Sequence, residues 1–299
     1  MMQLILLTDV LVRATPLLLT GLAVAIAFKA GVLNIGADGQ FLVGATVAAA
    51  IGILPGTHSA IVMLPLVLLG GMIGGGVWAM IAAFLRMRFQ VLEVISTIML
   101  NFIAMYVISY LVRGPLQEPT HIYPQTPTIA TAAQLPRIIP GTRLHAGFMI
   151  ALVLAIGLWW AFRTTAAGFR LRATGANPDA ARTTGLVDVA RVTMRALVLS
   201  GAIAGLAGAV EVSGVTYALY ENISPGYGYT AIAVALLAAL QPLGVIATGI
   251  LFGALEAGAS ALQRDANVPA TLAAVIEASI VLLVIAVGQL SRGWRRQTS

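Results

Sequence analysis

The stretch KAGVLNIGADGQ, from Lys29 to Gln40, decides the fold because it interrupts a long apolar run. Its three glycines and the polar side chains of Asn34, Asp38 and Gln40 are incompatible with a plain membrane-spanning helix. We interpret it as a helix break, whose freed backbone groups must be buried in protein or must line a polar cavity. An ordinary cytoplasmic turn between two helices is the alternative interpretation.

Apolar segments flank this break and continue along the chain. The sequence is 59% hydrophobic and only 9% charged, so lipid must be its solvent. Since a spanning helix needs ~20 residues, the pattern predicts an all-α, polytopic membrane helix bundle of about nine spans in a single domain covering residues 1–299. The expected spans are Pro16–Phe28, Gln40–Leu54, Ile61–Leu85, Val91–Val112, Ala146–Phe162, Ala196–Thr216, Tyr229–Ala239, Leu243–Leu262 and Thr271–Leu290.

The positive charges indicate how the chain is oriented in the membrane. The net charge of +6 comes from arginines beside apolar segments, which favours membrane orientation over nucleic-acid binding. By the positive-inside rule we expect three groups on the cytoplasmic side: Arg86 with Arg88, the loop 163–195, and the carboxyl-terminal Arg292, Arg295 and Arg296. The proline- and threonine-rich loop 114–145 then lies outside, as an extended cover or as a surface for an extracytoplasmic partner.

A second break is predicted at YENISPGYGYT, from Tyr220 to Thr230. Pro225, Gly226 and Gly228 interrupt a helix there, and Glu221 and Asn222 add polarity. This break is expected outside, whereas the first is expected inside. Two broken segments of opposite orientation favour an inverted pseudo-repeat with a transport route between the halves. The dipeptide Asn-Ile occurs at both Asn34 and Asn222, a weak echo between them.

A polar stripe runs along the fourth expected span. Glu93, Thr97 and Asn101 are spaced four residues apart, so they share one helix face. The stripe either lines a cavity or joins helices by hydrogen bonds. Three isolated acids in other spans fit packing, pore lining or a proton relay: Glu211, Glu256 and Glu277.

Motifs for common enzyme chemistry are missing. Lys29 is the only lysine and follows no GxxxxGK[ST], so the chain has no phosphate loop for ATP hydrolysis. HExxH and GxSxG are absent, and His58, His121 and His145 are scattered over outer loops, a pattern that does not favour a zinc centre. We expect a protein that is not an enzyme and carries no metal or cofactor.

The arginine-rich loop contains ATGANPDAARTTG, from Ala173 to Gly185, which predicts a short capped helix. Asn177 is a good N-cap, and Pro178 suits the first helical position. Asp179 favours the positive amino-terminal end, and Gly185 can close the far end. A stiff polar helix of this kind suits contact with another protein.

Taken together, these motifs resemble the permease subunits of bacterial ABC importers, in the nucleoside and simple-sugar branch related to the ribose and branched-chain amino acid permeases. The resemblance is carried by GLAVAIAFKAGVLNIGADGQFLVGA, EVISTIMLNFIA, GFRLRATGANPDAARTTG, LSGAIAGLAGA and ISPGYGYTAIAVALL, in order from about Thr15 to Leu290. It implies a multi-pass protein of the plasma (inner) membrane with a cytoplasmic helix that docks on an ATPase. The implied coupling residues are Gly175, Asn177, Pro178, Asp179, Ala180, Ala181, Arg182 and Gly185.

The resemblance also implies partners and an alternating-access pathway at the interface between two permease subunits. The partners are an ATPase subunit that binds ATP–Mg, a second homologous permease and an extracytoplasmic substrate-binding lipoprotein. The pathway residues are Asn34, Asp38, Gln40, Glu93, Thr97, Asn101 and Asn222. Departures at Leu92, Ala239 and Gln241, and the absence of a further apolar helix before the first span, leave the solute open between nucleoside and sugar. An ion-coupled secondary transporter that uses Glu93 or Glu256 is the alternative function.

Overall fold

The computed structural model describes residues 2–54, 59–183, 185, 187–266, 275, 278 and 279. Within them lie helices α1 (Met2–Lys29), α2 (Ala37–Gly52), α3 (Ala60–Phe89), α4 (Glu93–Arg113), η1 (Thr131–Ala133), α5 (Gly147–Thr164), α6 (Ala166–Ala176), α7 (Pro178–Thr183), α8 (Val189–Glu211), η2 (Val212–Thr216), α9 (Tyr227–Leu237) and α10 (Pro242–Ala266). Extended pairing in these ranges is limited to two isolated bridges, Gln125 with Tyr220 and Arg137 with His145. The all-α prediction is confirmed.

The helices fit a multi-pass membrane protein. Among the described residues, six helices are long and apolar enough to cross a membrane, and α2 and α9 are shorter apolar helices. These correspond to the first eight expected spans. The ninth, Thr271–Leu290, lies outside the described residues except for positions 275, 278 and 279, and so do His58, Thr184, Glu277 and the carboxyl-terminal arginines.

The first helix is longer than expected. The prediction began it at Pro16, but α1 starts at Met2 and continues through that proline. The two charges that interrupt the apolar run compensate each other, because Arg13 Nε lies 3.2 Å from Asp9 Oδ2 one turn away. A helix therefore accommodates both charges without ending.

The arginine-rich segment 163–195 is also more helical than expected. It was interpreted as a loop with one short helix, but α6 precedes that helix and α8 begins at Val189 instead of Ala196. Thr165 caps α6, since its hydroxyl accepts from Gly168 N. Asp188 caps α8 by accepting from Arg191 N. Both caps are isolated Thr and Asp residues that lack the fuller signature of the Asn177 cap.

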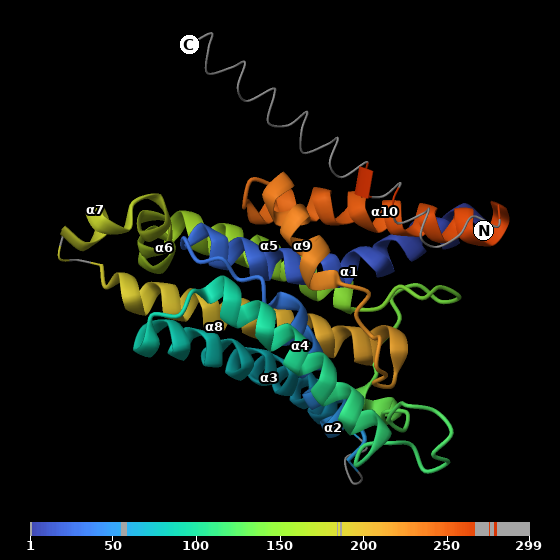
Figure 1. Cartoon of the computed structure of the whole chain (residues 1–299). Coiled ribbons are helices and arrows are strands. Elements are labelled where there is room, and N and C mark those ends of the chain that lie inside the picture. Colours follow the sequence, from blue (N-terminus) through green and yellow to red (C-terminus); the bar gives the residue numbers. More distant parts are fainter. Residues whose placement is uncertain are drawn as a thin grey trace.

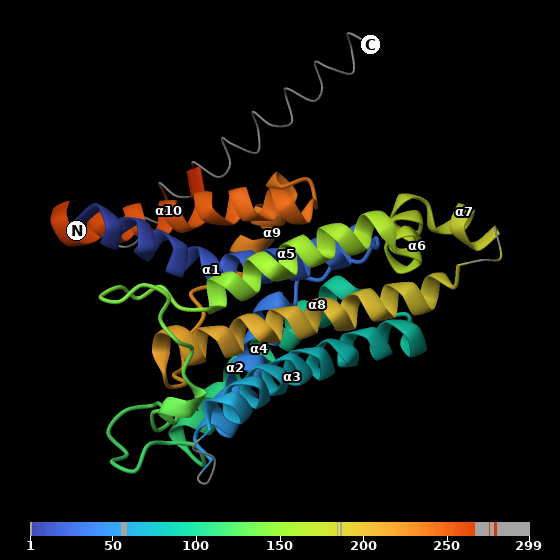
Figure 2. The same ribbon diagram turned by 180° about the vertical axis from the view of Figure 1, so that it is seen from behind.

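The bundle has two ends. Figure 1 shows α6 and α7 at one end, and Figure 2, from behind, shows α5 leading into them. We call this the arginine-rich end, and we call the opposite end, with residues 114–146, the loop end. Residues 114–146 are tied to the bundle by backbone hydrogen bonds: Thr126 N donates to Leu219 O, Ala130 N to Gly52 O and Leu135 N to Ser213 O. They form an ordered cover.

The helices follow an inverted repeat with exchanged partners. A long helix, a break, a short helix and another long helix occur first as α1–α2–α3 and then as α8–α9–α10. The two leading helices run in opposite directions (Figure 1). α2 and α3 pack on α8, whereas α9 and α10 pack on α1. Each half therefore completes the other, as the pseudo-repeat hypothesis requires.

Small residues allow α8 to cross its neighbours closely. A Cβ on Gly44 of α2 would lie 2.3 Å from Gly205 Cα, and one on Gly75 of α3 would lie 2.3 Å from Gly201 O. Lipid gives little hydrophobic drive for helix association, so the van der Waals contacts of such close backbone packing hold these helices together. This packing fixes the two halves around the breaks.

Candidate functional site: the joint between two helix breaks

The amino-terminal ends of α2 and α9 meet inside the bundle. Asp38, in the first turn of α2, accepts hydrogen bonds through Oδ1 from Ser224 Oγ at 2.7 Å and from Gly228 N at 3.0 Å. A carboxylate suits this place because both helix ends carry positive partial charge. We call the contact of Asp38 with Ser224 and Gly228 the joint.

The two chains touch backbone to backbone at the joint. A Cβ on Gly228 would lie 2.2 Å from Asp38 N, so only glycine fits there. Next to it, the rings of Phe41 and Tyr227 meet edge to face, with centroids 5.6 Å apart. From the joint α2 leads to the loop end, where Gly52 O accepts from Ala130 N. Each break therefore starts at one end of the bundle and returns to its interior.

A buried amide pair shapes the first break. Asn34 Nδ2 donates to Gln40 Oε1 at 2.8 Å, and Gln40 Nε2 donates to Asn34 Oδ1 at 3.0 Å. Asn34 Nδ2 also donates to Ser200 Oγ of α8, which donates to Ala23 O of α1. The predicted break is confirmed, and its polar side chains satisfy one another and the backbone.

Asn101 of α4 holds the start of α2. Its Oδ1 accepts from Gly39 N at 2.8 Å, which satisfies one of the free N–H groups of that helix end. Its Nδ2 donates to Ile35 O at 2.9 Å and to the Tyr229 hydroxyl of α9 at 3.0 Å. Asn101 thus connects α4 to both broken segments.

The other residues of the predicted pathway lie in different surroundings. Thr97 is buried, and its hydroxyl donates to Glu93 O of its own helix. Glu93 begins α4 at the arginine-rich end, where its carboxylate lies 2.9 Å from Arg86 Nη1 of α3. Asn222 is exposed in the second break. The structure therefore brings Asn34, Asp38, Gln40, Thr97 and Asn101 together around the start of α2, and leaves Glu93 and Asn222 apart.

Helix α7 carries the predicted cap. Asn177 Oδ1 accepts from Asp179 N at 3.1 Å and from Ala180 N at 3.0 Å, and the helix begins at Pro178. Gly185 follows its end with φ +67°, a left-handed conformation that favours glycine. Ala181 packs inward with Val187 and Val189, while Arg182 and Asp179 are exposed. The helix thus presents its polar face outward.

Gly175 joins this region to the first break. A Cβ at Gly175 would lie 2.1 Å from Lys29 O and 3.1 Å from Gly31 N, so the last turn of α6, just before α7, rests directly on the end of α1. From Gly31 the chain runs to Asn34 and then to Asp38 at the joint. A short, tightly packed segment therefore connects the end of α6, next to α7, with the joint.

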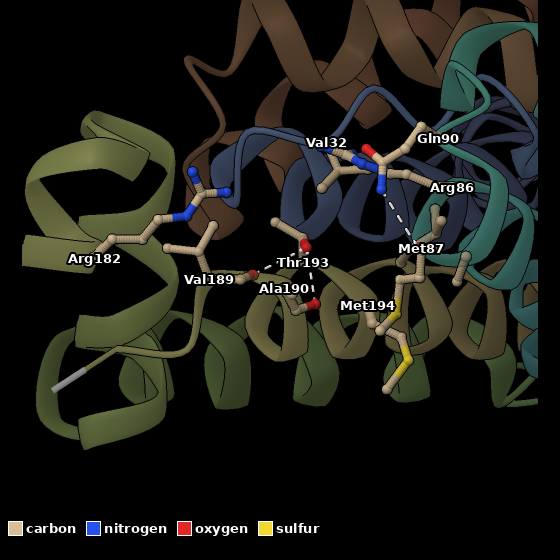
Figure 3. A pocket seen from close by; sticks show the side chains of 11 residues that line it. Val32, Arg86, Met87, Gln90, Arg182, Val189, Ala190, Thr193 and Met194 are labelled. Atoms are coloured by element: carbon tan, nitrogen blue, oxygen red, sulfur yellow. Dashed lines mark hydrogen bonds between the residues drawn. The ribbon is translucent and has the colours of Figure 1, made fainter. Parts of the chain in front are cut away.

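A pocket of about 220 Å³ opens beside α7. Figure 3 shows Arg182 of α7 on one side, Val189 and Thr193 of α8 below, and Arg86 and Gln90 on the other side. Val32 of the first break also lines it. The pocket is open and mixed in polarity, and it places the arginine-rich surface, α7 and the break next to one another.

The loop end is fastened by an ion pair. Arg113 Nε lies 2.6 Å from Glu221 Oε1, and Ser109 Oγ donates to the same oxygen. The hydrogen bond from Arg113, followed by that from Ser109, lowers the pKa of Glu221 to about 2. The carboxylate therefore stays ionised at any physiological pH, and the second break stays tied to α4.

Sequence reasoning missed three partners of the predicted polar residues. Ser200, Ser224 and Tyr229 lie 166, 186 and 128 residues from Asn34, Asp38 and Asn101 in the chain. A lone serine or tyrosine in an apolar segment gives no local signal for such pairing. Among the described residues no group of three His, Cys, Asp or Glu side chains could hold a metal ion.

Comparisons with known proteins support one family. The family profile described as "Branched-chain amino acid transport system / permease component" matches residues 6–287. The glucose ABC transporter permease protein of Haloferax volcanii is 37% identical over 292 residues, covering 93% of this chain and 76% of that protein. The guanosine ABC transporter permease protein of Bacillus subtilis is 37% identical over 276 residues, covering 91% and 78%.

A third relative, the nucleoside ABC transporter permease protein of Lactococcus lactis, is 30% identical over 278 residues, covering 90% of this chain and 76% of that protein. Bacillus subtilis and Lactococcus lactis each have a second permease protein of the same description that also matches, with lower identity. No solved structure matches the chain. The chain is a membrane permease subunit of an ABC transporter, does not itself catalyse ATP hydrolysis, and belongs to the branched-chain amino acid transport system permease family.

Proposed function

We propose that this chain forms the translocation pathway for a nucleoside or a simple sugar in an ATP-driven importer. The observation that carries this proposal is the similarity, over more than nine tenths of the chain, to permeases named for glucose and for guanosine. Both solutes contain a neutral sugar ring. Neither the structure nor the relatives favour an ion-coupled transporter.

Helix α7 is the proposed contact for a separate ATPase, which would bind the ATP–Mg that this chain has no motif to hold. The helix is capped, exposed on its polar side and anchored through Ala181 and Gly175. Because α7 is held in this way, a displacement of the helix by the ATPase would be transmitted through Gly175 to the first break. The arginine-rich end is then cytoplasmic, as the positive-inside rule predicts.

The residues predicted for the pathway have a more specific proposed role. Asn34, Gln40, Thr97 and Asn101 lie buried around the start of α2 and form hydrogen bonds within the protein. We expect them to hold the broken helices in position beside the pathway, with Asp38 joining the two halves. Glu93 is expected to anchor α4 at the arginine-rich end.

The complete importer requires further partners. Two different guanosine permease proteins of one bacterium are related to this chain, which supports a heterodimer of two permease subunits. An extracytoplasmic binding lipoprotein would deliver the solute to the loop end, where residues 114–146 form an ordered surface. The carboxyl terminus is expected in the cytoplasm.

Transport by the complete complex tests the substrate class. Proteoliposomes would contain this chain, its partner permease and its ATPase, with the binding protein added outside. We expect ATP-dependent uptake of tritiated guanosine or of radiolabelled glucose, above the level of liposomes without the binding protein. Uptake of neither solute, in a complex that hydrolyses ATP when it takes up some other compound, would overturn the substrate assignment.

Replacement of the α7 cap tests the coupling role. In the double variant Asn177→Gly with Pro178→Gly, both residues that start the helix are lost, so stimulation of ATP hydrolysis by the binding protein should disappear while the permease still inserts. Gly157→Ala on α5 is the matched control, because a Cβ there meets no atom within 4 Å. Unchanged stimulation in the double variant contradicts the assignment of α7.

A further inference from the structure

The start of α9 carries an exposed tyrosine halfway along the bundle. Tyr229, in the first turn of that helix, is 44% exposed, and its hydroxyl accepts a hydrogen bond from Asn101 Nδ2 of α4 at 3.0 Å. With a rise of about 1.5 Å per residue, Asn101 lies about 12 Å along α4 from Glu93 and about 18 Å from Arg113. The Tyr229 ring is therefore exposed at a level far from both ends of the spanning helix α4.

Lipid alone does not suit a tyrosine at this depth. Tyrosine is enriched at the two membrane interfaces, where its hydroxyl meets polar groups. Among the described residues, the Tyr229 hydroxyl accepts the bond from Asn101, and its own proton meets no acceptor. The non-helical Pro225, next to Ser224 of the joint, is exposed as well. Because non-helical backbone at membrane depth requires a protein cover or a water-filled cavity, this face of α9 turns towards another subunit or an aqueous pathway.

Helices α4 and α9 share this face of the bundle. Figure 1 shows both on the near side, whereas Figure 2, from behind, shows α5 on the near side. In agreement, α4 packs on α2 and α3, and α5 packs on α1, α6 and α10. Between Glu93 and Arg113 α4 has no charged residue, and α9 has none along its whole length. Since a charged solute would find no counter-charge on these two helices, the face suits a neutral one.

The Tyr229 side chain offers two kinds of contact to a nucleoside or a sugar. Its flat ring can pack against the C–H face of a sugar ring or stack on a nucleobase. Its hydroxyl has a proton to donate to an oxygen of the solute. Asn101 is itself held by Gly39 N and Ile35 O, so it fixes the Tyr229 hydroxyl and keeps the ring in one orientation.

We propose that Tyr229 lines the pathway between the two permease subunits and contacts the ring of the transported solute, with Asn101 as the residue that positions it. This rests on the proposed function, and it names both the face that turns towards the partner permease and the side chain that meets the solute. The preceding residue, Gly228, donates its N–H to Asp38 at the joint. A solute at Tyr229 therefore lies next to the contact between the two halves of the repeat.

Cysteine labelling tests this position, because the chain contains no cysteine of its own. The Tyr229→Cys variant would be assembled with a cysteine-free partner permease, ATPase and binding protein in proteoliposomes. During ATP-dependent turnover it would be exposed to methanethiosulfonate ethyltrimethylammonium, a polar reagent that modifies thiols in contact with water. The matched control is Ile156→Cys, near the middle of α5 on the opposite face and 53% exposed. Labelling of Tyr229→Cys should be at least tenfold faster than labelling of Ile156→Cys.

Protection by the solute distinguishes a position in the pathway from any other water-exposed place. Saturating guanosine or glucose, supplied with the binding protein, should slow the labelling of Tyr229→Cys at least threefold, and complete labelling should abolish uptake. Leu236→Cys is a second probe that leaves the bond from Asn101 intact. It lies seven residues further along the same face of α9 and is 47% exposed, so it should also be labelled at least tenfold faster than Ile156→Cys.

The proposal is overturned if Tyr229→Cys and Leu236→Cys are labelled no faster than Ile156→Cys, because the face then lies against lipid or in dry contact with protein. It is also overturned if labelling of Tyr229→Cys is not slowed by a solute that the wild type imports. In both cases uptake by the wild type leaves the proposed function intact. A wild type that imports neither solute removes the substrate class instead, and the comparison with Ile156→Cys still tests the face.

Discussion

Removal of the Asp38 carboxylate should separate the two halves at the joint. In Asp38→Ala, Gly228 N loses its acceptor inside the protein, and Ser224 Oγ loses its partner on α2. An unpaired buried N–H costs about 1–3 kcal/mol. A hydrogen bond between helices of a membrane protein contributes about 0.6 kcal/mol. The free energy of unfolding should therefore fall by about 2–4 kcal/mol in total.

The isosteric variant Asp38→Asn is the control for this prediction. Its amide oxygen can still accept from Ser224 and Gly228, so it loses only the favourable charge at two helix amino-terminal ends, worth about 0.3–1 kcal/mol. The assay is SDS-induced unfolding in mixed micelles, followed by circular dichroism, for wild type and both variants. Equal stability of Asp38→Ala and wild type, or equal damage by the alanine and asparagine variants, refutes the joint as described.

Three further predictions concern the two ends of the bundle. Gly175→Ala places a methyl group against Lys29 O, so it should uncouple ATP hydrolysis from uptake in proteoliposomes, whereas Gly157→Ala should not. Asn177→Ala removes the cap of α7 at a cost of about 1 kcal/mol, and hydrogen exchange of α7 should become several-fold faster. Burial, and then the charge of Arg143, lower the pKa of His145 from 6.5 to about 4. The folded protein therefore keeps the imidazole neutral, whereas the unfolded chain protonates it below about pH 6.5. The free energy of unfolding is thus at its full value above the ordinary pKa of His145 and decreases as the pH falls from 6.5 towards 4. After correction for intrinsic exchange, opening of residues 114–146 should increase over this range in the wild type and stay constant in His145→Gln.

Local signals predicted the helix breaks and the capped helix well. Three glycines together with Asn34, Asp38 and Gln40 within one short stretch of an apolar run favour a break over a continuous spanning helix. The sequence Asn-Pro-Asp before a helix, with Gly185 after it, contains the information for α7 in adjacent residues. Helix α6 was not predicted, because its start depends on a single Thr165 hydroxyl and not on several adjacent signals.

Contacts between side chains far apart in the chain could not be predicted from the sequence. Asn34 and Asn222 share a dipeptide, yet Asn34 is buried between α1 and α8 while Asn222 is exposed. The residue of the second break that meets the first is Ser224, because the inverted repeat brings together the helix starts and not the repeated dipeptides. Glu93 was placed in a stripe with Thr97 and Asn101 by helical spacing. Its ion pair with Arg86 depends on where α3 ends, which spacing within α4 does not specify.

The energy source of transport tests the central claim most directly. Uptake of tritiated guanosine and radiolabelled glucose should be measured in proteoliposomes under two conditions: ATP with the ATPase subunit present, and a proton or sodium gradient with the ATPase omitted. Because this chain has no phosphate loop and presents α7 for a partner, uptake should require ATP and the ATPase and should be absent with a gradient alone. Gradient-driven uptake by the permease without the ATPase would contradict the account.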